Sequence, residues 1–135
     1  MALYASWIEI PVNDLERAIL FYQKVFDLAE IPIYDEPPSR IAVLLPSEKS
    51  VGNPGISLVK SPSHRPSDAG PQINFHVDTH AALTTALHHV QAQGGTIDTE
   101  LVDMEDGVHY ITLLDSEGNR IALSSYEALD EQGTD

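Results

Sequence analysis

The chain contains no cysteine and few basic residues. Its 135 residues include 7 Lys and Arg against 21 Asp and Glu, which gives a net charge of −14. Without cysteine, the protein has no disulfide, no thiolate zinc site and no catalytic thiol. So few basic residues argue against nucleic acids and anionic membranes as partners, because both need a basic surface. An anionic ligand would be repelled unless a local arginine captured it.

Long hydrophobic runs are also absent. No apolar segment approaches the roughly 20 residues that a membrane-spanning helix needs. Residues 1–12 contain no Lys or Arg, and Glu9 interrupts their apolar stretch, so we expect no signal peptide. The length suits one domain. These absences favour a small cytoplasmic protein.

Apolar residues follow two kinds of spacing along the chain. Up to residue 12 they alternate, which predicts a strand over residues 4–12. Over residues 15–26 they recur every three or four positions, which predicts an amphipathic helix. A second helical stripe follows Thr79 and ends at Gly94-Gly95. Further strands are expected at residues 31–34, 41–45, 55–60, 73–77, 96–102, 108–114 and 120–126.

The two halves of the chain are copies of each other. Ile8, Ile10 and Val12 match Ile73, Phe75 and Val77 at a constant spacing, and each half reads strand, helix and three strands. We therefore predict one α+β domain over residues 1–126. Its parts are two βαβββ modules (3–60 and 71–126) and a proline-rich linker (61–70), followed by an acidic, disordered tail (127–135).

One such module cannot bury both its helix and the inner face of its strands. Two modules placed edge to edge would form one curved, eight-stranded mixed sheet, with helices outside and a concave cavity inside. A concave sheet with a polar lining is a suitable ligand site.

Three segments resemble a known family. They are WIEIPVNDLERAILFYQKVF (Trp7 to Phe26), INFHVDTHAALTTALHHVQAQGGTI and ITLLDSEGNRIALSSYE. They are similar to the vicinal oxygen chelate superfamily of glyoxalases, bleomycin resistance proteins and extradiol dioxygenases, over about residues 3–126. The nearest subgroup is that of bacterial proteins related to lactoylglutathione lyase. The resemblance implies the paired βαβββ fold, a small organic ligand in the sheet cavity and a homodimer.

The resemblance also implies a divalent cation, held by side chains from the first and last strands of each module. Those positions fall at Trp7, Ser57, Gln72 and Ala122, and the internal repeat pairs them in the same way. Trp and Ala cannot bind a metal, and Ser and a single Gln bind weakly. We therefore predict no standard metal site and no cofactor. Glyoxalase and dioxygenase chemistry are both put in doubt, because each needs the cation.

Strand alternation places other polar side chains beside these positions. Glu9 shares a face with Trp7, and Asn74 and His76 share one with Gln72. We predict Glu9 or His76 as a general acid or base. The alternatives are a structural carboxylate for Glu9 and a packed core or rim histidine for His76. The predicted ligand-binding residues are Trp7, Ser57, Gln72, Asn74, Tyr110 and Ala122; for Trp7 and Tyr110 the alternative is packing in the core.

Two function classes therefore stay open. One is a binding protein that sequesters a small aromatic or amphipathic compound, as bleomycin resistance proteins do. The other is an enzyme of the lyase, isomerase or dioxygenase kind, which would use Glu9 or His76 or a non-standard metal site. Glu9, His76 and His109 have the composition of such a metal site, although their spacing does not require one.

Overall fold

The computed structural model describes residues 3–48 and 52–129. Both halves of the chain follow the predicted order of strand, helix and strands. The strand expected at residues 96–102 is divided into two short pieces. The elements are β1 (Trp7–Pro11), α1 (Leu15–Phe26), β2 (Ile33–Glu36), β3 (Ser39–Leu45), β4 (Gly55–Lys60), β5 (Ile73–Val77), α2 (His80–Ala92), β6 (Thr96–Ile97), β7 (Val102–Asp103), β8 (Val108–Leu114) and β9 (Arg120–Tyr126).

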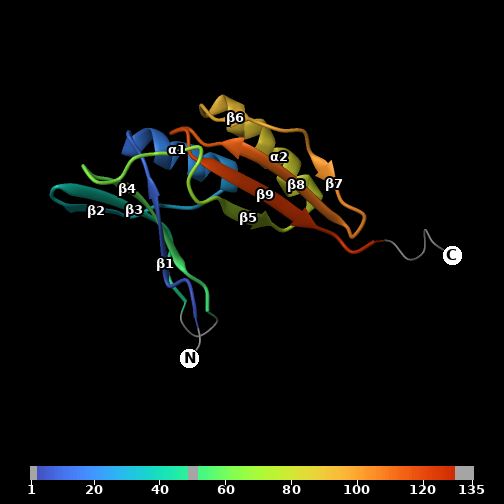
Figure 1. Ribbon diagram of the computed structural model, residues 1–135, viewed down its shortest axis with the longest axis horizontal. Coiled ribbons are helices and arrows are strands. Elements are labelled where there is room, and N and C mark those ends of the chain that lie inside the picture. Colours follow the sequence, from blue (N-terminus) through green and yellow to red (C-terminus); the bar gives the residue numbers. More distant parts are fainter. Residues whose placement is uncertain (1–2, 49–51, 130–135) are drawn as a thin grey trace.

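The strands form two sheets, one from each module (Figure 1). The first has the order β1-β4-β3-β2. The second has the order β5-β9-β8-β6, and β7 also pairs with β8. Only β1 with β4 and β5 with β9 run parallel among the paired strands of the described chain.

The α+β class and the two modules are thus confirmed, but the strands do not make one continuous eight-stranded sheet. β1 and β5 are each the end strand of their own sheet, and no ladder joins the sheets in the described residues. In Figure 1 the two sheets point in different directions, and both helices lie near their junction.

Both helices begin at a capping side chain. The Asp14 carboxylate accepts a 3.0 Å hydrogen bond from the Arg17 backbone N–H at the start of α1. At α2, the Thr79 hydroxyl accepts one from the Ala82 backbone N–H. α1 ends at Asp27, whose φ of 51° is left-handed. Neither described helix has the length and apolar character to cross a membrane.

One hydrophobic core runs through both modules. Phe21 and Tyr22 of α1 are fully buried, and the Tyr22 ring packs edge-on against Phe75 of β5, with 6.1 Å between ring centroids. Leu83 of α2 and Leu123 of β9 belong to the same cluster. The two helices therefore share one core, which holds the modules together.

A carboxylate from the second module completes the start of α1. Glu117 lies in the turn between β8 and β9, and its side chain is fully buried. Its Oε1 accepts the backbone N–H groups of Asn13 and Asp14 at 2.9 Å each, and its Oε2 accepts Arg17 Nε at 2.7 Å. Burial alone would raise the pKa of this carboxyl, but the hydrogen bonds from Arg17 and the backbone outweigh burial and lower it.

The same turn carries a second buried connection. Tyr22 donates its hydroxyl proton to Asp115, and Asn119 donates its side-chain amide to the Pro11 carbonyl at 2.8 Å. Burial, and then the nearby Asp115 charge, raise the pKa of Tyr22 well above its usual value. The turn between β8 and β9 thus binds both the end of β1 and the middle of α1.

The predicted tail begins with a residue that is held in place. The Glu127 carboxylate accepts the backbone N–H of His80 at 2.7 Å, at the start of α2. Residues 130–135 of the predicted tail lie outside the described residues.

Candidate functional site

The predicted site residues lie on the two sheets, in separate groups. Trp7, Glu9 and Ser57 belong to the first sheet, where Glu9 is paired with Ser57. Their alternating neighbours, such as Ile10 and Leu58, are buried in the core that α1 covers. The three side chains therefore lie on the sheet face that points away from α1. The second group is Gln72, Asn74, His76, Tyr110 and Ala122.

Trp7 forms an aromatic platform on the first sheet. Its ring lies directly over Gly55, so closely that a Cβ at Gly55 would clash with it. The residue is nevertheless 44% exposed. On the same face, Ser57 is fully buried, and its hydroxyl has no hydrogen-bond partner among the described residues. This face thus combines an open aromatic ring with an unsatisfied polar atom.

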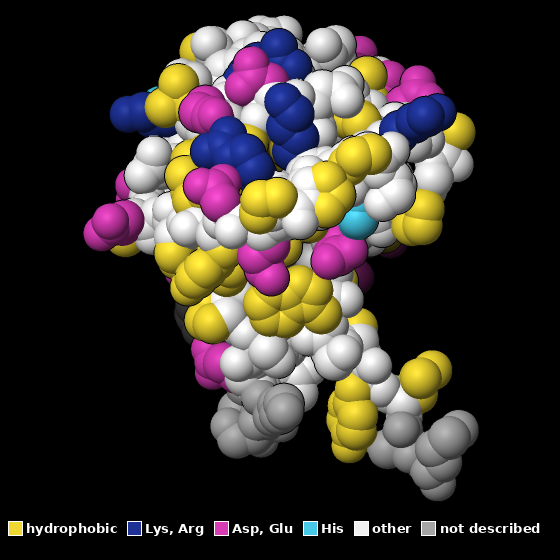
Figure 2. All heavy atoms as spheres, turned by 90° about the vertical axis from the view of Figure 1, so that its left-hand side faces the viewer, with side chains coloured by type: hydrophobic (Ala, Val, Ile, Leu, Met, Phe, Trp, Pro, Cys, Tyr) yellow, Lys and Arg dark blue, Asp and Glu magenta, His cyan; other side chains and the backbone are white. Residues whose placement is uncertain are grey.

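Figure 2 views the molecule from the side of the first sheet. Hydrophobic side chains are exposed there, with acidic groups and a histidine among them. Leu3, Tyr4, Trp7 and Tyr34 are large exposed hydrophobic residues in or beside the first sheet. An apolar surface of this kind commonly marks a ligand or protein interface.

Glu9 forms an unexpected hydrogen-bonded chain. Glu9 Oε1 lies 2.9 Å from His64 Nε2, and His64 Nδ1 lies 2.6 Å from Ser61 Oγ. Ser61 and His64 lie in the predicted linker, where periodicity assigns no residue to a face. Glu9 was recognised from its strand, whereas no sequence signal connected it with either partner. The chain acid–imidazole–hydroxyl is a proton-transfer arrangement.

Polar side chains of the second group make two separate sets of contacts on the second sheet. Gln72 donates its side-chain amide to Asn74 at 3.0 Å and to the Tyr110 hydroxyl at 3.1 Å. His76 Nδ1 lies 3.1 Å from Ser124 Oγ. Asn74 is paired with Ala122, which is buried and carries no donor or acceptor in its side chain. These contacts place the group on one face of the second sheet.

The four family ligand positions do not fit a divalent cation. Trp7 and Ala122 have no ligand atom, and Gln72 offers one neutral amide oxygen, on a side chain whose nitrogen donates to Asn74 and Tyr110. The hydroxyl of Ser57 is buried, and it is a poor neutral ligand. Across residues 3–48 and 52–129, no cluster of three or more His, Asp or Glu side chains is arranged to hold a metal.

The alternative metal set is not brought together in the chain. Glu9 lies on the first sheet and His76 on the second. His109 is stacked on His80, with 3.5 Å between ring centroids, and His109 Nε2 lies 3.4 Å from Asp103. His109 is paired with Ser125, whereas His76 contacts Ser124, so the two histidines lie on opposite faces of their sheet.

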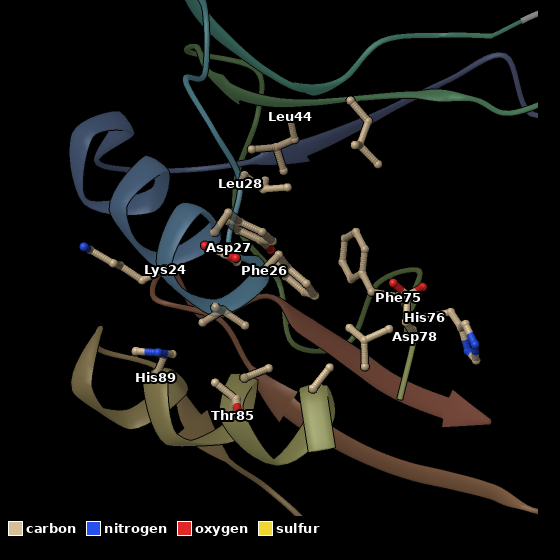
Figure 3. Close-up of a pocket in the computed structure, with 16 residues that line it drawn as sticks. Lys24, Phe26, Asp27, Leu28, Leu44, Phe75, His76, Asp78, Thr85 and His89 are labelled. Carbon is tan, nitrogen blue, oxygen red and sulfur yellow. The ribbon is translucent and has the colours of Figure 1, made fainter. Parts of the chain in front are cut away.

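A cavity of about 730 Å³ separates the end of α1 from α2 and β5. Its floor is aromatic, because the Phe26 and Phe75 rings lie 4.9 Å apart. Figure 3 shows these two rings facing each other, with His76 and Asp78 on β5 and its continuation. His76 is thus the predicted site residue that lines this cavity. The charged or polar lining also includes Lys24, Asp27, Thr85 and His89.

A smaller cavity, of about 340 Å³, lies beside Ser61. Arg40 and Lys60 both line it. Arg40 is bonded to Glu16 at 2.7 Å and to Asp35 at 2.8 Å, so two carboxylates compensate its charge. No ion pair involves Lys60 in the described part of the chain. The cavity therefore contains one cation that its neighbours do not neutralise.

Solved structures share this fold over all or most of the chain. A glyoxalase/bleomycin resistance protein/dioxygenase domain from Frankia sp. EAN1pec is 13% identical, with full coverage of both chains and a TM-score of 0.72. The fosfomycin resistance protein FosX of Listeria monocytogenes is 18% identical, with full coverage of both and a TM-score of 0.68. A glyoxalase I mutant from Zea mays is 20% identical over 88% of this chain and 46% of its own, with a TM-score of 0.68.

The low identities establish the fold alone. None of the curated proteins matches the chain in sequence. The family model described as Glyoxalase/Bleomycin resistance protein/Dioxygenase superfamily matches residues 5–123. That match spans both modules, both sheets and every predicted site residue. The chain therefore belongs to the glyoxalase/bleomycin resistance protein/dioxygenase superfamily.

Proposed function

We propose that this protein binds a small aromatic or amphipathic molecule on the open faces of its sheets, without the family's cation. One observation carries the proposal: the half-exposed Trp7 ring and the buried hydroxyl of Ser57, which has no partner in the described chain, lie on the same face of the first sheet. An aromatic ligand would stack on the indole ring. A polar group on the same ligand would reach the buried Ser57 hydroxyl only by displacing the side chains that cover it, and would then supply the hydrogen bond that this hydroxyl lacks.

The complete site is formed by a homodimer in this proposal. In one chain, the Trp7 face and the Gln72 face belong to separate sheets, and each sheet ends in an open strand, β1 or β5. An open strand edge is a template for pairing with another chain. A second copy that placed its β5 edge beside β1 would bring the two faces into one concavity. Tyr126 and Met104 add exposed apolar surface on the second module, as Tyr4 does on the first.

The absence of suitable metal ligands favours binding over the family's metal chemistry. A carboxylate or imidazole at the ligand positions would be needed to hold the cation that polarises a substrate oxygen. Elemental analysis of the untagged protein tests this directly, together with turnover of the methylglyoxal–glutathione adduct in added nickel or zinc. We expect neither stoichiometric metal nor turnover. Both together would overturn the metal-free proposal.

Ligand binding has a direct spectroscopic readout, because Trp7 is the single tryptophan of the chain. A panel of naphthols, hydroxyquinolines and other small bicyclic aromatics should include compounds that quench its fluorescence and raise the melting temperature. Trp7→Ala should remove the thermal shift. The control is Tyr34→Ala, at another exposed aromatic on the first sheet. Unchanged shifts in Trp7→Ala would exclude Trp7 from the site.

The dimer is tested by light scattering after size exclusion across a concentration series. We expect twice the chain mass. Trp7→Arg should shift the equilibrium toward the monomer, whereas Glu105→Arg, in the exposed turn between β7 and β8, should not. A wild-type protein that stays monomeric at high concentration would contradict the shared cavity.

The enzyme alternative retains one specific support, which is the contact between Glu9 and His64. A carboxylate that orients an imidazole is a general acid–base arrangement. It does not require the family's cation.

A further inference from the structure

We infer that Ser61, His64 and Glu9 form a nucleophilic relay that is acylated by small carboxylic esters. The inference goes beyond the proposed binding function and does not rest on it. The two contacts of the relay, 2.6 Å from Ser61 Oγ to His64 Nδ1 and 2.9 Å from His64 Nε2 to Glu9 Oε1, are both within hydrogen-bond distance. A nucleophile, a base and a residue that orients the base define this chemistry on unrelated folds.

The local chain holds the relay in place. β4 ends at Lys60, and the backbone then turns so that the His64 N–H donates to the Ser61 carbonyl at 3.3 Å. The turn brings the His64 ring back over β1, where Glu9 projects from the open face. The Ser63 backbone N–H donates to Ser61 Oγ at 3.2 Å. This donor helps to fix the position of Ser61 Oγ beside the imidazole ring.

The two contacts of His64 determine which nitrogen carries its proton. A carboxylate accepts hydrogen bonds, so Nε2 donates its proton to Glu9. Nδ1 is then left with a lone pair, which accepts the hydroxyl proton of Ser61. The His64 side chain is 27% exposed and that of Glu9 48%, so the relay is open to a ligand from solvent. Glu9 acts through His64 and is a positioning residue.

The reaction that this geometry supports is acyl transfer. Ser61 Oγ attacks the ester carbonyl carbon as its proton passes to His64 Nδ1, and a new carbon–oxygen bond forms. The bond to the leaving alcohol breaks, and Nδ1 returns the proton to that oxygen. Water then attacks the acyl-serine and gives a proton to Nδ1. The carboxylic acid leaves, and Ser61 recovers its proton, so no cation or oxidant is required.

The neighbouring cavity indicates the substrate class. Ser61 lines the 340 Å³ cavity, whose size suits a small acyl group. Lys60 lines the same cavity without an ion pair in the described chain, in a protein of net charge −14. A negative charge on the acyl chain would be held by this cation. We therefore expect esters of short dicarboxylic acids to react faster than neutral esters of similar size.

The test measures acylation at Ser61. Wild-type protein is mixed with p-nitrophenyl acetate or with the mono-p-nitrophenyl ester of succinic acid, and nitrophenol release is followed. The acylated peptide is then identified by mass spectrometry. We expect a burst, an adduct on Ser61, and faster reaction of the succinate ester that is lost in Lys60→Met. No adduct on Ser61 in the wild type would overturn the inference, and so would an adduct on other residues alone.

Variants separate the roles in the relay. Ser61→Ala should abolish the burst, whereas Ser67→Ala, in the same linker, should keep it. His64→Gln should slow acylation about 100-fold or more. Glu9→Gln should lower the maximal acylation rate with the half-saturating ester concentration unchanged, as expected for a residue that positions the base. Equal rates in Ser61→Ala and wild type, with both folded by circular dichroism, would overturn the relay.

The relay and the binding function can each be refuted without the other, because their experiments have different readouts. Acylation is read at Ser61, and aromatic binding is read from the fluorescence of Trp7. A missing adduct in a protein that still binds aromatic ligands would overturn the relay alone.

Discussion

The hydroxyl of Tyr22 donates a 2.6 Å hydrogen bond to Asp115, and this bond joins the first helix to the closing hairpin of the second module. Both residues are buried. Because burial and the Asp115 charge raise the pKa of Tyr22 well above its usual value, the phenol stays protonated and remains a donor. The bond is therefore a fixed part of the contact between the modules.

Tyr22→Phe should reveal the contribution of this bond to stability. The substitution leaves a buried carboxylate without one of its donors, and we expect a loss of about 1–3 kcal/mol in the free energy of unfolding. Urea titration measures it. Tyr34→Phe is the control, because Tyr34 is 53% exposed, and its effect should stay within about 0.5 kcal/mol. Equal effects of the two variants would show that the bond adds nothing.

Glu117 should make stability depend on acid pH. Its pKa is lowered in the folded protein, so its contribution is present above the unfolded value, near 4.5, and is lost as pH falls through the lower folded value. Arg17 is half exposed and partly screened, so we expect Glu117→Gln to cost on the order of 2 kcal/mol at pH 7. Thermal melts from pH 7 to pH 3 should show the variant and the wild type converging. A gap that stays constant with pH would contradict this account.

Alanine substitutions at two glycines should distinguish the cost of backbone strain from the cost of a steric clash. Gly107 and Gly118 both have a φ of +91°, which disfavours any other residue. A Cβ at Gly118 would meet nothing, so Gly118→Ala should cost about 1–2 kcal/mol from the backbone alone. At Gly107 it would collide with the Glu127 carbonyl, so Gly107→Ala should cost clearly more. Chemical denaturation of both variants gives the comparison, which fails if Gly118→Ala is the more damaging.

Two buried serines should respond in opposite ways to alanine. The Ser57 hydroxyl has no partner in the described chain, so Ser57→Ala should leave the stability unchanged or raise it. The Ser125 hydroxyl lies 2.6 Å from His80 Nδ1, so Ser125→Ala should cost about 1 kcal/mol. If the proposed ligand bonds to Ser57, the alanine variant should also bind it more weakly. A marked loss of stability in ligand-free Ser57→Ala would show that its hydroxyl has a partner.

Periodicity predicted the elements because each strand or helix buries one face, and burial leaves a regular pattern in the sequence. A shared face for Gln72, Asn74 and His76 was predicted from the same alternation, whereas the hydrogen bond from Gln72 to Tyr110 was not. The division into two sheets was not predicted either, because the pairing of module edges is a matter of tertiary packing. An alternating pattern predicts which face of a sheet a residue occupies. It does not predict which strand, if any, pairs with the strand at the edge of that sheet.

The residues whose contacts the sequence patterns did not predict lie in turns. His64 contacts Glu9 across 55 positions of the chain, from a linker whose prolines and serines show no period. Glu117 lies in a turn whose Asp, Gly and Asn residues are sufficient to form the turn. No sequence pattern therefore indicated a distant contact for Glu117. Its role at the start of α1, 103 positions away from Asp14, becomes visible only when the modules are packed together.

The buried carboxylate of Glu117 predicts what would happen if the chain were cut in the linker between its two modules. In a fragment that ended in the linker, the N–H groups of Asn13 and Asp14 just before α1 would lose their acceptor, and the Tyr22 hydroxyl would lose Asp115. The complementary fragment would contain the Glu117 carboxylate without its partner Arg17. The repeat in the sequence thus describes two halves that are alike in form but not self-sufficient. Mixed as separate fragments, they should fold together or not at all.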